Sequence, residues 1–123
     1  PENWKLIKTA SIDRSESLNE SHPYSASVET KVDVKSTGVI IFIEVKAISS
    51  ILESRIVISD LEGEFYKAIF LKEIISSDTE KFEFLIDDVP QDVRELKVYV
   101  WNGDTKEQLQ LNSINMLLYQ INE

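Results

Sequence analysis

A strict alternation of apolar and charged residues constrains the fold of this chain more than any other feature. The clearest example is Val28–Lys35, whose sequence is VETKVDVK, and Lys81–Ile86 repeats the pattern as KFEFLI. Successive side chains of a β-strand point to opposite faces, so a period of two indicates a strand with one dry and one wet face. Both segments are therefore predicted to be half-buried strands.

The same period recurs along the chain, with turn residues between the apolar runs. Asp60–Gly63 separates two such runs, and Gly63 can adopt the positive φ that a tight hairpin needs. The strand beginning at Val39 should be central in its sheet because both of its faces are apolar. Strands are expected over 4–12, 28–35, 39–47, 55–59, 64–71, 81–86 and 96–101.

The last stretch, Leu109–Ile121, fits a helix nearly as well as a strand, and we favour the strand. Seven or eight strands, with turns about every 8 to 12 residues, predict an all-β fold, an antiparallel β-sandwich. We expect residues 1–123 to form a single domain in which the serine-rich segment 13–23 is a polar loop with nothing to bury. Three Gly and three Pro are few for so many turns, so Asp, Asn and Ser must build some of the connections.

The expected core consists of the apolar positions that alternate along these strands. They are Val28, Val32, Val34, Ile41, Ile43, Val45, Ile56, Ile58, Phe82, Phe84, Ile86, Leu96, Val98 and Val100.

Composition excludes several classes of protein. Hydrophobic residues make up 42% of the chain and charged residues 28%, which is ordinary for a globular domain and excludes a disordered one. The net charge of −9 would repel a phosphate backbone, so nucleic acid is not expected as a partner. The longest apolar run, Val39–Ile43, is far short of the roughly 20 residues that cross a bilayer, so no membrane insertion is predicted.

No arrangement of ionisable residues in the sequence points to catalysis or to a cofactor. The chain has no Cys and a single His, His22, which lies in the polar segment and is interpreted as a surface residue. The nearest carboxylate pairs, Asp87 with Asp88 and Glu62 with Glu64, make weak candidates for a glycosidase pair. Calcium could be held by acidic loops such as 87–92 and 102–107, but we favour solvated loops that keep the domain soluble. We therefore predict a protein that is not an enzyme, with no metal site.

The stretch from residue 39 to residue 109 resembles a family of immunoglobulin-like accessory modules in secreted and cell-surface proteins of clostridia and related Gram-positive bacteria. The likeness rests on the acidic hairpin in Ile58–Phe65, on the alternating strand Lys81–Ile86 and on the aromatic strand Leu96–Gly103. The resemblance implies an immunoglobulin- or fibronectin-like sandwich that acts as a spacer, a support or an interaction domain. It also implies an extracellular or cell-surface location in a bacterium.

Tyr99 and Trp101 share a strand face with Lys97, opposite the aliphatic face of the same strand. If the aliphatic face is the core, the two rings point outward and could stack on a sugar or contact a protein. Alternatively, the N-terminal segment with Trp4, or the C-terminal tail, covers them, and we favour such a cover. The candidate contact residues are Tyr99, Trp101, Lys97, Asn102 and Asp104.

Three functions remain open at this point. The first is a non-catalytic structural or interaction module whose partners are other domains of a parent protein or other proteins. The second is a carbohydrate-binding module that uses the aromatic residues as a platform for a glycan. The third is a self-assembling subunit of a surface filament, in which a terminal strand pairs with the next copy. The oligomeric state does not follow from the sequence.

Overall fold

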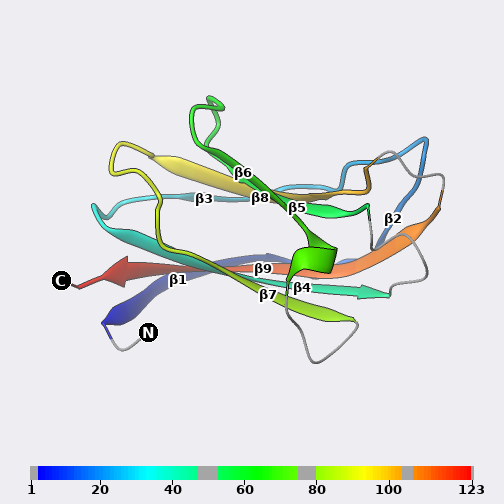
Figure 1. Cartoon of the computed structure of the whole chain (residues 1–123). Helices are drawn as coiled ribbons and strands as arrows, with labels where there is room; N and C mark the ends of the chain where they lie inside the picture. The colour runs from blue at the N-terminus through cyan, green and yellow to red at the C-terminus, as the bar shows by residue number, and fades with distance from the viewer. Residues whose placement is uncertain (1–2, 47–52, 75–79, 104–106, 123) are drawn as a thin grey trace.

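The computed structural model describes residues 3–46, 53–74, 80–103 and 107–122, and it places their strands in two layers (Figure 1). The strands are β1 (Trp4–Ile12), β2 (Glu16–Leu18), β3 (Val28–Lys31), β4 (Thr37–Lys46), β5 (Arg55–Ser59), β6 (Tyr66–Phe70), β7 (Lys81–Ile86), β8 (Glu95–Trp101) and β9 (Leu109–Ile121). A short 3₁₀ helix, η2 (Leu71–Glu73), follows β6. The described residues contain no helix with the length and hydropathy that crossing a bilayer requires.

The two layers are antiparallel sheets. One has the strand order β1-β9-β4-β7, with β2 also paired to β9, and the other has the order β3-β8-β5-β6. The predicted antiparallel β-sandwich is therefore confirmed, and β4 is central between β9 and β7 as expected. The expected strand over the last stretch is also confirmed, because β9 spans Leu109–Ile121.

The core lies between the sheets, where the alternating apolar side chains of both meet. Ile41 on β4, Ile58 on β5 and Val98 on β8 are fully enclosed. At roughly 25 cal/mol per Å² of apolar surface removed from water, this burial is the main favourable contribution to folding. Of the expected core, Val34 and Phe84 are only partly buried, and Phe84 packs against the edge of the cluster.

The strand order differs from the immunoglobulin-like order that the resemblance implies. In an immunoglobulin sandwich, sheets of the ABED and CFG type pair several strands that are neighbours in sequence. Here successive strands from β3 to β9 change sheet at every connection except β5 to β6. This is the double Greek-key arrangement of a jelly roll. Alternation along the sequence could not distinguish the two, because it indicates which face of a strand is buried but not which strands are paired.

The topology also explains why few Gly and Pro residues suffice. A connection between layers spans about 10 Å and does not need a tight positive-φ turn, whereas a hairpin does. The hairpin between β5 and β6 follows the prediction, with Gly63 at a φ of 77° and the Asp60 N–H donating to the Phe65 carbonyl at 3.0 Å.

The two terminal strands pair with each other in the same sheet. Trp4 of β1 is opposite Ile121 of β9, and the Asn122 N–H donates to the Asn3 carbonyl at 2.8 Å. The beginning of β1 and the end of β9 therefore lie at the same end of the sandwich (Figure 1). Gly38 on β4 makes room for the Trp4 ring, because a Cβ at Gly38 would lie 2.6 Å from it.

The segment 13–23 was expected to be a loop with nothing to bury, and that expectation is wrong at β2. Leu18 is fully enclosed in the core, and β2 pairs with β9 from Glu16 opposite Leu111 to Leu18 opposite Leu109. A single apolar residue among serines gives no periodic signal, so its burial depends on a partner strand about 90 residues away in the sequence.

Replacing Leu18 by Ala tests whether β2 belongs to the core. We expect Leu18→Ala to lower the free energy of unfolding by roughly 2–5 kcal/mol, because it leaves a cavity in an enclosed site. The control is Leu6→Ala, since Leu6 is 48% exposed on β1 and should cost much less. Urea unfolding followed by circular dichroism measures both variants. Equal costs for the two would show that Leu18 is not enclosed as described.

Candidate functional site

The outer face of the four-stranded sheet holds the aromatic residues identified in the sequence. On β8, Leu96, Val98 and Val100 point into the core, whereas Tyr99 and Trp101 point outward and are partly exposed. The expected cover is not the one observed. Trp4 lies on the other sheet with its ring 5.6 Å from that of Tyr119, and the tail forms β9 of that sheet.

Four planar side chains form a row across this face, which we call the aromatic row: Phe70, Arg55, Trp101 and Tyr24. Arg55 on β5 is opposite Phe70 on β6 and Trp101 on β8, and Tyr24 forms a bridge to Trp101 on the far side of β8. Residues opposite each other on antiparallel strands project from the same face, so the register alone aligns these groups.

The groups of the aromatic row contact one another through their flat faces. The Arg55 Cζ lies 4.3 Å from the centroids of both the Phe70 and the Trp101 rings. The Tyr24 ring is stacked on Trp101 at a centroid distance of 6.0 Å and an interplanar angle of 11°. Trp101 therefore has Arg55 beside one face and Tyr24 beside the other. Its ring is not the open platform that the sequence suggested.

The exposed rings of this face are two tyrosines. Tyr24 is 54% exposed, and Tyr66 on β6 is 57% exposed. Tyr99 on β8 lies between β6 and the segment that carries Tyr24. Burial raises the pKa of the Tyr99 hydroxyl, and the nearby Tyr66 and Tyr24 hydroxyls raise this pKa further. Val57 also faces outward in this register, yet it is buried beneath its neighbours. The face is therefore an aromatic surface, and the buried Val57 side chain lies beneath its rings.

Backbone hydrogen bonds beside Tyr24 hold it at the edge of β8. The Ser25 N–H donates to the Val100 carbonyl at 2.9 Å, and the Val100 N–H donates back to the Ser25 hydroxyl at 2.9 Å. On the other side of Tyr24, the Asn102 N–H donates to the Pro23 carbonyl at 2.8 Å. These bonds extend the sheet by a short irregular segment, which positions Tyr24 against Trp101.

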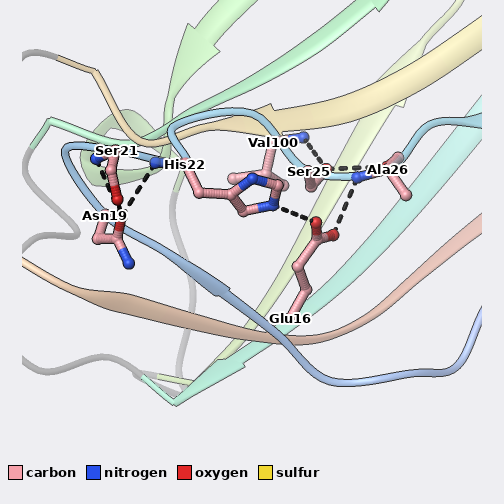
Figure 2. Close-up of polar contacts among 7 residues, drawn as sticks. All are labelled: Glu16, Asn19, Ser21, His22, Ser25, Ala26 and Val100. Carbon is pink, nitrogen blue, oxygen red and sulfur yellow. Dashed lines mark hydrogen bonds and ion pairs between the residues drawn. The ribbon is translucent and has the colours of Figure 1, made fainter.

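The Glu16 carboxylate of β2 contacts the same segment, as Figure 2 shows. Its carboxylate accepts from the Ala26 N–H at 2.9 Å and contacts the His22 Nε2 at 2.7 Å. Burial alone would raise the pKa of Glu16. The hydrogen bonds from His22 and Ala26, together with the charges of His22 and Arg14, outweigh burial and hold the pKa below its ordinary value.

Asn19 closes the loop before Tyr24. Its side-chain oxygen accepts from the Ser21 N–H and the His22 N–H, each at 3.0 Å, and from the Ser21 hydroxyl at 2.8 Å (Figure 2). His22 thus has a structural contact in a folded loop.

The other candidate contact residues lie in different settings. Asn102 is buried, with its amide donating to the Leu18 and Glu107 carbonyls at 3.3 and 2.9 Å and its oxygen accepting from Ser54 at 2.8 Å. These bonds connect the end of β8 to the end of β2 and to the residues just before β5 and β9, and they leave Asn102 no exposed surface for a ligand. Lys97 lies on the outer face, its Nζ 5.9 Å from the Tyr99 centroid. Asp104 is outside the described residues.

The described carboxylates that were considered for acid–base chemistry or for calcium binding lie in different places. Asp88 pairs with Lys67 at 2.7 Å, and Glu62 and Glu64 line an open acidic cavity of about 360 Å³ beside the β5–β6 hairpin. Within the described ranges, no three His, Cys, Asp or Glu residues are grouped as a metal ion would require.

Sequence reasoning missed Tyr24, Arg55, Phe70 and Tyr66. Arg55 and Phe70 occupy outward positions of expected strands, so alternation could have assigned their face but not their neighbours. Tyr24 lies in a polar segment without periodicity, and only the register of its bridge to β8 brings it to Trp101.

Comparisons with known proteins support the fold. No family model matches the sequence, and no curated protein matches it. Among solved structures, the VP2 subviral particle of infectious bursal disease virus matches with a TM-score of 0.56 and 12% identity, over 98% of this chain and 33% of that chain. A mutant of Xylanase10C from Cellvibrio japonicus, in complex with xylopentaose, matches with a TM-score of 0.54 and 11% identity, over 93% of this chain and 28% of that chain.

A third structure is similar over nearly its whole length. FLHE matches with a TM-score of 0.50 and 13% identity, over 96% of this chain and 93% of that chain. This chain therefore spans about a third or less of the viral and xylanase chains but most of FLHE. At these identities the likeness shows a shared β-sandwich fold and nothing further.

The lowered pKa of Glu16 predicts a change of stability with pH. Because folding lowers this pKa from its ordinary value of 4.5, the folded state favours the ionised carboxylate. The resulting stabilisation is complete above the ordinary pKa and is lost as the pH falls through the lowered value. We expect Glu16→Gln to be less stable than the wild type at pH 7 and to lose less stability between pH 6 and pH 3.

Urea unfolding at several pH values measures this difference. Glu20→Gln is the control, because it removes an exposed carboxylate from the same loop. Parallel pH curves for Glu16→Gln and the wild type would contradict the assignment.

Proposed function

We propose that this protein is a non-catalytic binding module and that the outer face of its four-stranded sheet binds a glycan. The observation that supports this most strongly is the gathering of five aromatic side chains on one sheet face: Tyr24, Tyr66, Phe70, Tyr99 and Trp101. A sugar ring has an apolar face of C–H groups and a rim of hydroxyls, so it suits a surface of amphipathic rings. Xylanase10C, a fold neighbour, was solved with xylopentaose, which is consistent with this proposal.

The geometry supports different roles for the rings in this proposal. Tyr24 and Tyr66 are the most exposed, so their ring faces and hydroxyls are the proposed contacts. Trp101 contacts Arg55 and Tyr24 through its flat faces, so it supports Tyr24 and offers its edge to a ligand. Rings held by their neighbours lose little conformational freedom on binding, which favours affinity.

A binding role is favoured over catalysis because two of the ionisable residues considered for chemistry, His22 and Asp88, are engaged in ion pairs within the chain. His22 pairs with Glu16, and Asp88 pairs with Lys67.

We also propose an extracellular or cell-surface location and a single domain over residues 1–123. The location rests on the resemblance of the sequence to bacterial accessory modules.

A second candidate function is a protein contact through the other sheet. Leu6, Phe42 and Leu85 are 48%, 38% and 43% exposed on strands β1, β4 and β7 of the five-stranded sheet. Contiguous exposed apolar patches mark contact surfaces, and these three side chains lie on one sheet. The filament alternative has less support, because both terminal strands are already paired within the chain.

Truncation of the exposed rings tests the proposed glycan binding. We expect Tyr24→Ala and Tyr66→Ala each to weaken glycan binding about tenfold or more, since each removes a ring that contacts the sugar. A glycan array identifies the ligand, and isothermal titration calorimetry with that ligand measures the loss.

Phe42→Ala is the matched control, because it removes an exposed ring from the opposite sheet and should leave the affinity unchanged. The proposal fails if no glycan binds the wild type, or if Phe42→Ala lowers the affinity as much as Tyr24→Ala does.

A further inference from the structure

Arg55 stands out on the aromatic face because no anionic group among the described residues pairs with it, although the protein is acidic. The chain has 22 Asp and Glu residues against 13 Lys and Arg residues. The ion pairs between described residues join Lys8 to Asp33, His22 to Glu16 and Lys67 to Asp88, and none involves Arg55. Among the described residues, no carboxylate pairs with Arg55 to neutralise its charge.

The two rings beside Arg55 fix its orientation and partly dehydrate it. Its guanidinium lies between Phe70 and Trp101, and the Nε is buried without a hydrogen-bond partner among the described residues. A cation between two aromatic faces is stabilised by their quadrupoles, but its N–H groups still require acceptors. Since Nε alone among the guanidinium nitrogens is buried and unpartnered, the two terminal nitrogens form the edge that a ligand can reach.

Two lysines add positive charge to the same face. The Lys72 Nζ lies 4.9 Å from the Phe70 centroid, and the Lys97 Nζ lies 5.9 Å from the Tyr99 centroid. Neither takes part in the ion pairs of the described residues. The aromatic face thus combines rings for stacking with cations that have no carboxylate partner in the part of the chain that the structure describes.

We infer that this face selects glycans that contain uronic acid residues, whose carboxylate binds the free edge of Arg55. The inference rests on the proposed glycan binding and adds the class of sugar. A carboxylate is planar and accepts two parallel hydrogen bonds from the guanidinium edge, a geometry that Lys cannot provide. Tyr24 and Arg55 lie two strands apart, roughly 10 Å, so one chain of sugars can stack on Tyr24 and place a neighbouring carboxylate at Arg55.

Carboxylated glycans suit this protein better than densely sulfated ones. The net charge of −9 repels a polyanion outside the aromatic face, and this repulsion grows with the charge density of the polymer. A polymer with a single carboxylate on each sugar gains the Arg55 contact at a smaller electrostatic cost.

Polygalacturonate and its fully methyl-esterified form provide a matched pair of probes, because they share a backbone and differ in charge. Alginate provides a second uronate polymer, neutral xylan an uncharged one and heparin a sulfated one. Affinity electrophoresis and calorimetry with the full chain measure binding to each. We expect at least one uronate polymer to bind at least tenfold more tightly than esterified polygalacturonate and xylan, and salt to weaken that binding.

Four variants separate the contribution of Arg55 from general charge. Arg55→Gln should lower uronate affinity about tenfold or more, and Arg55→Lys should recover only part of the loss. Lys46→Gln removes an exposed cation from β4 of the other sheet and should bind as the wild type does. Lys72→Gln, at an exposed position after β6, should weaken uronate binding by a few-fold.

The outcomes distinguish this inference from the proposed function. Equal binding of neutral and uronate polymers would overturn the uronate assignment while supporting glycan binding. Preferential binding of heparin would overturn it in favour of sulfate. Failure of every uronate polymer to bind would overturn the uronate assignment, and failure of every glycan on the array as well would overturn both. If Arg55→Gln does not fold, Lys72→Gln decides the question, because unchanged uronate affinity in that variant would also overturn the assignment.

Discussion

The structure depends on the two-sided character of β8. Its inward residues, Leu96, Val98 and Val100, are fully enclosed, and its outward residues carry the aromatic surface. Core packing holds the backbone of this strand rigidly, since side chains in a dense interior cannot shift independently. The same packing therefore positions Tyr99 and Trp101, and a substitution in the core beneath them would alter both stability and the aromatic surface.

The jelly-roll topology places residues distant in sequence beside one another on this face. Strands β8 and β5 are neighbours in the sheet although β6 and β7 separate them along the chain. The aromatic row forms only when β5, β6, β8 and the segment at Tyr24 are all in register. A one-residue slip of any of these strands would turn its side chains to the opposite face. The core favours the observed register, because a slip would expose Val98 or Ile58 to water.

Local patterns in the sequence predicted most strands, the hairpin at Gly63 and the inward faces, since those features depend on neighbouring residues. The pairing of strands within a sheet depends on contacts between distant segments, which local patterns do not indicate. The immunoglobulin-like order came from the resemblance instead, and it differs from the observed order. Tyr99, Trp101 and Lys97 were assigned to the correct face of their strand, but Arg55, Phe70 and Tyr24 were not connected to them. Asn102 was expected to be a contact residue, whereas in the structure it is buried and its side chain makes three hydrogen bonds within the chain.

Net charge and local charge lead to different conclusions for this protein. A charge of −9 acts on large polyanions such as nucleic acids, which contact a broad surface. A small anionic group at the aromatic row responds mainly to charges within a Debye length of about 8 Å, where Arg55 and Lys72 lie beside uncharged rings. The rings also exclude water there, which strengthens each electrostatic contact. An acidic domain can therefore attract a carboxylate at one face while its remaining surface repels dense polyanions.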